Sequence, residues 1–255
     1  MQPRRTAADW RDAASYAALL DADRPLLAWE WLRRDPGYAA AAHAALGGRG
    51  GATAVSPRSW GLEAFENPDR TAPDARPVWT RDIHAAVLAV IAAESAAGAD
   101  SFDLNSLVQL STLLPDRAGG EHLLLSDGLR AIRIDILAGT VGCGPVRLRY
   151  QFGGLAGAEP PLLALRRLIH LCRTGRFSRS LHAREPRTRR RLLTLRAYDA
   201  LAAGADQREI AAVLLAPGAR GPRWRSEAPS LRSRAQRLVR GTRRMATGGY
   251  RALLR

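Results

Sequence analysis

The sequence of 255 residues contains no lysine and only two cysteines, Cys143 and Cys172. Two cysteines at this separation provide neither a disulfide framework nor the spacing of a zinc site, which fits a reducing cytoplasm. His170 lies two residues before Cys172, so the two side chains would not share a helix face as metal ligands should, and we expect a structural role for both. No run of about 18 apolar residues exists, so no membrane span is expected.

The first residues of the chain show no recognisable targeting signal. Met1 to Arg5 has no apolar run behind it, so no signal peptide is visible. Together with the cysteine usage, this predicts a cytoplasmic protein without membrane contact.

Common enzyme motifs are missing as well. No G-x-S-x-G, H-E-x-x-H or P-loop pattern occurs. The glycine-rich stretch 47–51 has no Lys-Ser/Thr after it and no strand pattern before it, so a linker is expected. The few carboxylates of the last third do not cluster as a metal site requires; they are Glu185, Asp199, Asp206, Glu209 and Glu227. We therefore expect no enzyme activity, no metal and no cofactor.

Positive charge is abundant and unevenly placed. The chain carries a net charge of +15 and its isoelectric point is about 11.4. Residues 161–255 hold 23 arginines against 5 acidic residues, a balance of +18, so residues 1–160 carry −3. This asymmetry suggests a nucleic-acid-binding module joined to a nearly neutral one.

The basic third has the pattern of a helix-turn-helix. A first helix is predicted over Arg189–Ala203 and ends at Gly204. A second opens with a D-x-x-E capping signal, in which the carboxylate of Asp206 would accept an orphan backbone N–H and Glu209 would reach back to the cap. A third is predicted over Ser230–Met245.

The third helix separates into two sides at about 100° per residue. One side is apolar and consists of Leu231, Ala235, Leu238, Val239 and Met245. The other is polar and consists of Arg232, Ser233, Gln236, Arg237, Arg240, Arg243 and Arg244. No acidic residue follows Leu231, so the positive side repels itself unless it meets a polyanion. A solvated arginine-rich face is the alternative reading, but the coincidence with a three-helix pattern favours DNA.

Specific contacts follow from side-chain chemistry. Near the start of the third helix, Arg232, Gln236 and Arg237 are expected at base edges, because arginine pairs with guanine and glutamine with adenine. Phosphate contacts are expected from Arg240, Arg243 and Arg244, and from the loop before the helix. The predicted DNA-binding residues are Arg223, Trp224, Arg225, Arg232, Ser233, Gln236, Arg237, Arg240, Arg243 and Arg244.

The amino-terminal segment predicts a small helical bundle. A compact helical segment follows Asp9–Asp12, a second helix is predicted over Asp23–Arg34, and Asp35-Pro36 reads as an N-cap followed by proline at the first helical position. Its aromatic residues are expected in the core, since aromatics dominate burial in so small a unit. They are Trp10, Tyr16, Trp29, Trp31 and Tyr38.

The middle of the chain changes to a period of two. Ile132, Ile134 and Ile136 alternate with polar residues after a turn at Ser126–Gly128, and a second alternation covers Val146–Phe152. We expect an antiparallel meander here. An amphipathic helix after Glu159 should cover it through Leu162, Leu165, Leu168, Ile169 and Cys172. The apolar run Ala85–Ala93 suits a buried strand, although a helix is not excluded, and Leu104–Leu114 is expected to form a short helix.

These elements predict an α+β protein with a small N-terminal helical bundle, a central antiparallel β-meander with a covering helix, and a C-terminal three-helix helix-turn-helix. The expected divisions are residues 1–50 for the helical module and 51–118 for a linker and partly structured connection. The sheet with its helix would occupy 119–187 and the DNA-binding domain 188–255.

Two regions resemble known families. Asp9–Asp12 with Tyr16, and the stretch Ala28–Tyr38 (Ala-Trp-Glu-Trp-Leu-Arg-Arg-Asp-Pro-Gly-Tyr), resemble the transcriptional regulator-like module of proteobacterial proteins. The carboxyl half is similar to the domain that commonly follows that module; the matching stretches are 122–128, 144–150, 206–211, 224–226, 230–234 and 248–254.

Proteins that join both modules resemble the transcriptional activators of integrative and conjugative elements of rhizobia and their relatives. The resemblance implies that the carboxyl domain binds double-stranded promoter DNA and that a small antiactivator can block it. The nearly neutral front portion would then contact RNA polymerase or a regulator. An alternative from the residues alone is a non-enzymatic interaction module, an antiactivator or adaptor, whose basic helix binds an acidic partner.

Overall fold

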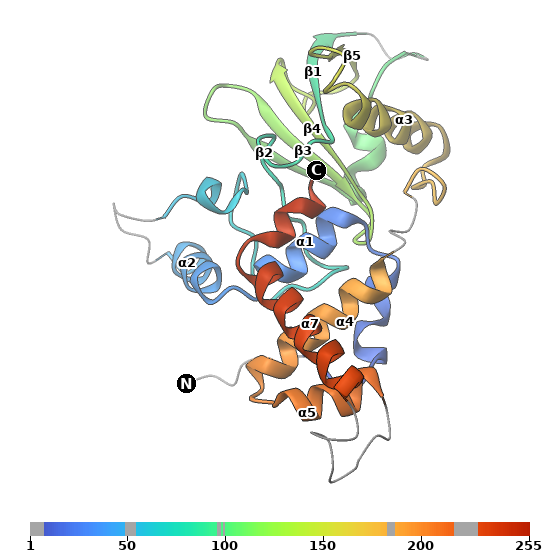
Figure 1. The fold of residues 1–255 in the computed structure, drawn as a ribbon. Coiled ribbons are helices and arrows are strands. Elements are labelled where there is room, and N and C mark those ends of the chain that lie inside the picture. The colour runs from blue at the N-terminus through green and yellow to red at the C-terminus, as the bar shows by residue number, and fades with distance from the viewer. Residues whose placement is uncertain (1–7, 49–54, 96–97, 99, 183–186, 217–228) are drawn as a thin grey trace. The chain divides into compact units, whose positions relative to one another are not determined.

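A computed structural model describes residues 8–48, 55–95, 98, 100–182, 187–216 and 229–255 (Figure 1). The chain divides into two compact units. One comprises Met1–Asp21 and Arg184–Tyr250, and the other comprises Ala22–Ala183 and Arg251–Arg255. Helices near both ends of the sequence and a five-stranded sheet between them confirm the α+β class.

The sheet belongs to the second unit and has the strand order β2-β3-β4-β1-β5. Its strands are β1 (Val87–Glu94), β2 (Ser111–Pro115), β3 (Glu121–Ser126), β4 (Ala131–Ala138) and β5 (Val146–Gln151). Strands β2, β3 and β4 are antiparallel neighbours, which confirms the predicted hairpin. Strand β1 pairs in parallel with β4 and antiparallel with β5.

The expected meander is therefore wrong at one point, since β5 does not pair with β4. The apolar run Ala85–Ala93, which is compatible with a strand or a helix, forms β1, and β1 lies between β4 and β5. Its first four residues are buried, so it needs an interior position with neighbours on both edges. Strands β1 and β2 also come from the stretch expected to be a connection, where Leu104–Leu110 forms the 3₁₀ helix η3 and Ser111 already starts β2.

The region of the turn between β3 and β4 contacts the loop that contains Pro73 and the first helix of this unit. Gly128 has a φ of +93°, and a Cβ on it would come within 2.3 Å of the carbonyl oxygen of Pro73, so only glycine fits. Asp23 caps α1 (Arg24–Leu32) by accepting from Leu26 N, while its other oxygen accepts from Ala131 N at 2.8 Å. Burial raises the pKa of Asp23 to about 7, despite these two N–H groups. A single buried carboxyl thus joins α1 to the sheet.

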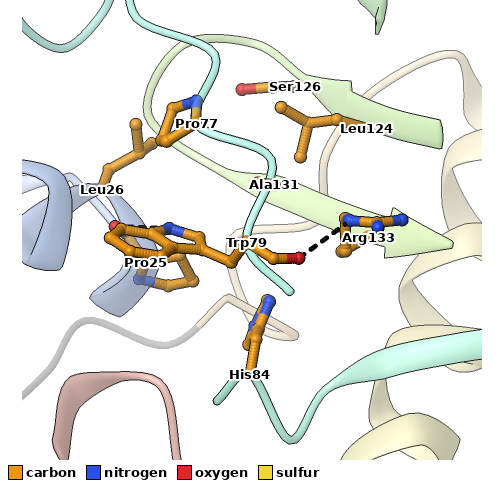
Figure 2. Close-up of a pocket in the computed structure, with 9 residues that line it drawn as sticks. All are labelled: Pro25, Leu26, Pro77, Trp79, His84, Leu124, Ser126, Ala131 and Arg133. Carbon is orange, nitrogen blue, oxygen red and sulfur yellow. Dashed lines mark hydrogen bonds between the residues drawn. The ribbon is translucent and has the colours of Figure 1, made fainter. Parts of the chain in front are cut away.

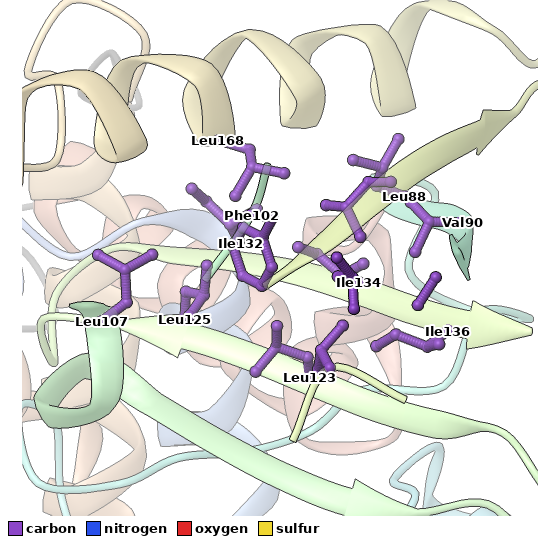
Figure 3. Close-up of a cluster of buried hydrophobic side chains, with 14 of the residues drawn as sticks. Leu88, Val90, Phe102, Leu107, Leu123, Leu125, Ile132, Ile134, Ile136 and Leu168 are labelled. Carbon is purple, nitrogen blue, oxygen red and sulfur yellow. The ribbon is translucent and has the colours of Figure 1, made fainter. Parts of the chain in front are cut away.

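Helix α3 (Glu159–Thr174) covers the apolar face of the sheet, as predicted (Figure 3). The core beneath it includes Leu88, Val90, Leu123, Leu125, Ile132, Ile134 and Ile136. The buried side of the helix differs from the expected stripe, however. It consists of Ala164, Leu168 and Leu171, with Leu165 partly buried, whereas Leu162, Ile169 and Cys172 are exposed. The helix is thus rotated relative to the expectation, with Ala164 rather than Leu162 against the strands.

The Ala28–Tyr38 part of the regulator-like motif lies in this unit, and its residues have structural roles. Asp35 caps α2 (Pro36–Leu46) as predicted. Glu30 is buried, pairs with Arg33 and Arg34, and accepts from Ala72 N at 3.0 Å. Burial opposes the charge of Glu30, but the two arginines hold its pKa below the usual value. Trp29, Trp31 and Tyr38 are buried, which confirms their expected place in the core. Short 3₁₀ helices occur at η2 (Pro57–Trp60) and η5 (Gly249–Leu253).

The other unit contains the predicted helix-turn-helix elements together with the 3₁₀ helix η1 (Ala14–Leu20). The predicted elements are α4 (Thr188–Ala202), α5 (Gln207–Ile210) with the π-helical turn η4 (Ala211–Leu215), and α7 (Pro229–Ala246). Asp206 caps α5 by accepting from Glu209 N at 2.7 Å, as expected. The segment η1 differs from the expectation of one N-terminal bundle, because it groups with α4 rather than with α1 and α2.

Two histidines of the sheet unit are buried without complete hydrogen bonding. His84 Nδ1 and His182 Nε2 have no partner among the described residues. Burial and the neighbouring charge of Arg133 lower the pKa of His84 to about 3. Burial and the charge of Arg167 lower the pKa of His182 to about 4. Both rings are therefore neutral in the folded protein at pH 7.

We predict a pH-dependent stability difference between the wild type and His84→Gln. Between pH 6.5 and 3 the unfolded chain binds a proton at His84 that the folded chain does not, so stability present above pH 6.5 is lost on acidification. The wild type should lose up to about 1.4 kcal/mol per pH unit relative to the variant. Urea unfolding at pH 7.5, 6 and 5, followed by tryptophan fluorescence, measures this difference. Equal pH slopes in both proteins would contradict it.

Candidate nucleic-acid interface

Helix α7 packs through one side only. Ala235, Val239 and Thr242 are buried, and the hydroxyl of Thr242 donates to the carbonyl oxygen of Thr194 on α4 at 3.1 Å. Leu231, Leu238 and Met245 are half-buried beside them. Figure 1 shows α7 running along α4, with α5 near its beginning. The predicted apolar side of this helix is thus confirmed as its packing side.

The opposite side of α7 is exposed along its whole length. The exposed residues are Arg232, Ser233, Gln236, Arg237, Arg240, Arg243 and Arg244. Among the described residues, none of these arginines forms an ion pair with a carboxylate of the chain. Seven polar side chains, five of them cationic, thus face solvent together. Arg234 is exposed too, at the border of this surface, and it was missed because its place on the wheel lies nearer the apolar side.

The three remaining predicted contact residues, Arg223, Trp224 and Arg225, lie outside the described residues. The structure therefore describes only part of the predicted site. Its described portion comes from one helix and forms one continuous row, which we call the α7 arginine face (Arg232, Arg237, Arg240, Arg243 and Arg244, with Ser233 and Gln236).

A segment far away in sequence completes the core beneath this face. Trp10 is buried with Ala197, Ala200, Ile210 and Val239. Because α4 presents alanines at the contact, it leaves room for an indole ring. Trp10 of the segment 8–21 therefore fills the space that the small side chains of α4 leave open.

Polar contacts hold the same segment in place. Arg196 donates from Nε to the carbonyl oxygen of Trp10 at 2.9 Å and from Nη2 to that of Arg11 at 2.8 Å. Tyr16 donates to the carboxylate of Asp199 at 2.6 Å, and Arg11 pairs with Glu209. The predicted backward reach of Glu209 to its own cap is thus replaced by an ion pair with the amino-terminal segment.

A second polar group lies on the sheet, on the side away from α3. His122 Nδ1 lies 2.7 Å from the carboxylate of Asp135, and Arg133 Nη2 lies 2.7 Å from the same oxygen. Glu63 is 3.5 Å from His122 Nε2. Burial opposes the charge of Asp135, but the hydrogen bond from His122 and the charge of Arg133 hold its pKa below the usual value.

This polar group is structural rather than catalytic. The side chains of His122, Arg133 and Asp135 are all buried, so no substrate reaches them. In the described part of the chain, no group of His, Cys, Asp and Glu is placed to hold a metal ion. The only sequence signal for this group is that His122, Arg133 and Asp135 alternate with the core-facing residues of β3 and β4.

A cavity of about 10 Å³ lies next to Arg133. Figure 2 shows Arg133 donating to the carbonyl oxygen of Trp79, with His84 below it. The other lining residues are Pro25, Leu26, Pro77, Leu124, Ser126 and Ala131. The space suits about one water molecule, which is far below the size of a ligand site.

Two known families match separate parts of the chain. Residues 159–255 match a family described as "T6SS, Transcription factor, DNA binding domain". Residues 9–63 match the "Proteobacterial transcriptional regulator-like domain", which is the family suggested by the Trp-Glu-Trp motif. No curated protein matches the chain. Within the described residues, no helix is long and apolar enough to cross a membrane.

We predict that Trp10→Ala destabilises the helix-turn-helix unit although Trp10 lies off the α7 arginine face. Removing a buried indole leaves a cavity, and the cost should be about 3 kcal/mol. Hydrogen exchange of the backbone amides of α4 and α7 measures the loss of protection. Leu46→Ala is the control, since Leu46 is exposed in the other unit and should change neither helix. Unchanged protection in Trp10→Ala would show that residues 8–21 are not part of this unit.

Proposed function

We propose that this DNA-binding transcription regulator reads the major groove of a specific operator with α7. The observation that carries the proposal is the α7 arginine face, which is exposed and has no carboxylate partner in the described residues. A helix of 18 residues is about 27 Å long, so it spans a groove and reaches the phosphates at its borders. The match of residues 159–255 to a DNA-binding domain supports the same conclusion.

The two ends of α7 would have different tasks. Arg232, Ser233, Gln236 and Arg237 lie in its first half, and in helix-turn-helix proteins the first residues of the recognition helix contact base edges. Arg232 and Arg237 differ by about 140° around the helix, with Gln236 between them. These side chains therefore reach different base pairs across the groove floor.

The second half of α7 would bind the backbone. Arg240, Arg243 and Arg244 are exposed near the carboxyl end, where a helix that enters the groove at an angle leaves it. Arginine donates to phosphate oxygens through a charged planar group, which fixes orientation without reading sequence. We assign phosphate contacts also to Arg223 and Arg225 beside Trp224.

Our proposals about which genes are regulated, and whether they are activated, rest on the resemblance to known families. We propose activation of the excision and transfer genes of an integrative and conjugative element, with RNA polymerase as a partner and a small antiactivator as an inhibitor. The matched family's description names T6SS instead, which makes T6SS promoters the second candidate target. The sheet unit holds 20 arginines against 16 acidic residues, a balance of +4 compared with +11 for the other unit, so its surface is better suited to such protein contacts.

We predict different effects for two substitutions on α7. Arg243→Ala should weaken binding to all duplexes about equally and reduce the slope of log K against log salt by about 0.9, because one phosphate contact is lost. Gln236→Ala should change the preference among sequences by about 1–3 kcal/mol at one base pair and leave the salt slope unchanged. Binding titrations from 50 to 300 mM salt measure both effects.

Arg117→Ala serves as the matched control for these titrations. Arg117 is exposed in the sheet unit, so its loss removes the same charge away from α7. If the control lowers affinity as much as Arg243→Ala, net charge rather than the α7 arginine face binds DNA. If neither α7 substitution affects binding, the helix does not contact DNA, and a nuclease-insensitive protein complex would then favour the interaction-module alternative.

We predict that a genome-wide footprint of the intact protein will give a small number of strong sites upstream of transfer or T6SS genes. A sequence-specific regulator binds its operators about 10³–10⁷ times more tightly than other DNA, so few sites should dominate. Transcript levels of the adjacent genes in a deletion strain then give the sign of regulation. Uniform occupancy along the genome would contradict sequence-specific recognition.

A further inference from the structure

Strand β5 forms an edge of the sheet that is only partly closed. Val146 exchanges two backbone hydrogen bonds with Phe102, at 2.7 and 2.9 Å, on the side away from β1. Backbone groups alternate along a strand, so those of Leu148 and Tyr150 point to the same outer side. Among the described residues, neither has a backbone partner there. The outer edge beyond Val146 can therefore accept another strand.

One flank of α3 lies on the same face of the sheet as Tyr150 of β5 and carries exposed apolar side chains. The opposite flank is held toward the rest of the sheet unit, because Arg167 Nε donates to the carbonyl oxygen of Leu181 at 2.9 Å. Leu162 and Ile169 lie on the other flank and are 45% and 40% exposed. Cys172 is on that flank too. Burial raises the pKa of Tyr150 on β5, and the nearby Cys172 raises it further. The free flank of α3 is therefore the one beside β5.

The apolar residues around the edge form one surface from two elements. Tyr150 and Phe152 are 38% and 42% exposed at the end of β5, and they continue the row that begins with Val146 and Leu148. Leu162 and Ile169 add two exposed apolar side chains on the flank of α3 that carries Cys172. Together they would cover alternate side chains of a strand added to β5, as the sheet's own strands are covered by Leu168.

The other face of β5 is cationic. Arg147 and Arg149 are exposed, and they lie across from Ala93 and Ile91 of β1. No ion pair of either arginine occurs among the described residues. An added strand would place its second set of side chains next to these two charges, about 5 Å away.

This charge pattern argues against a second copy of the chain as the added strand. If β5 paired with β5 of another copy in a register centred on Leu148 or Arg149, arginine would lie opposite arginine. Like charges in directly opposite positions destabilise a strand pair. Acidic side chains at the same positions would instead gain a cross-strand charge pair each.

We propose that the outer edge of β5 is a docking site for an extended segment of a partner protein in which apolar and acidic residues alternate. The apolar residues pack under Leu162 and Ile169, and the acidic residues lie beside Arg147 and Arg149. The backbone of the segment bonds to Leu148 and Tyr150. This site lies in the sheet unit and does not depend on the DNA-binding role of α7.

A labelled peptide with the sequence Val-Glu-Val-Asp-Val-Glu-Val tests the site by fluorescence anisotropy with the full chain. We expect saturable binding that is at least tenfold tighter than that of the same peptide with lysine in place of each acid. Tyr150→Pro should weaken binding at least tenfold, because it removes an outward N–H while the hydrogen bonds to β1 remain. Tyr150→Phe keeps that N–H and the ring, and it should bind as the wild type does.

Charge variants keep the test decisive if Tyr150→Pro does not fold. Arg149→Glu should weaken the acidic peptide at least tenfold and favour the lysine peptide, whereas Arg117→Glu, the same change elsewhere on the unit, should have no effect. Equal binding of both peptides, or equal effects of the two charge variants, overturns the proposal. It is overturned also if Arg149→Glu abolishes binding of duplex DNA and leaves the peptide unaffected, because the strand face is then a nucleic-acid contact.

Discussion

Helix α7 can bury only one of its sides, and packing decides which one. Ala235, Val239 and Thr242 are small enough to lie directly against α4, where Thr242 also satisfies a main-chain carbonyl. Every arginine of the helix is thereby turned to solvent. With no carboxylate following Leu231 in the sequence, their repulsion is not relieved within the helix and is relieved best by an external polyanion. The DNA-binding role proposed for this chain depends on that constraint.

The basic unit is built from two ends of the chain. Residues 8–21 lie in it with α4, α5 and α7, while the chain between them forms the sheet unit. Both matched families therefore extend over the two units: residues 9–63 begin in one and continue into the other, and residues 159–255 begin with α3 of the sheet unit. Neither match corresponds to a single compact body.

Glu30 and the aromatic residues of the Ala28–Tyr38 motif are buried and make structural contacts. Glu30 is ionised inside the protein because two arginines and the amide of Ala72 surround it, and Tyr38 donates to the carbonyl oxygen of Glu66 at 2.7 Å. These contacts fix the long loop that leads to β1. Glu30 and Tyr38 of this motif therefore hold an irregular segment in place.

Local patterns of the sequence determined the helices, their caps and the two sides of α7. Asp23, Asp35 and Asp206 each cap the helix that follows them, because a capping carboxylate acts within three residues. The alternation around Ile134 determined a strand in the same way. Nothing local specified that β1 would separate β4 from β5, because strand partners are chosen by burial among all strands at once. Only the tertiary structure brought Trp10 to Ala197, turned α3 so that Ile169 stays exposed, and left one edge of the sheet open beside it. Contacts of this kind join residues that are distant in sequence. Their stabilising free energy comes from packing between separate segments, so it cannot be inferred from any one short stretch.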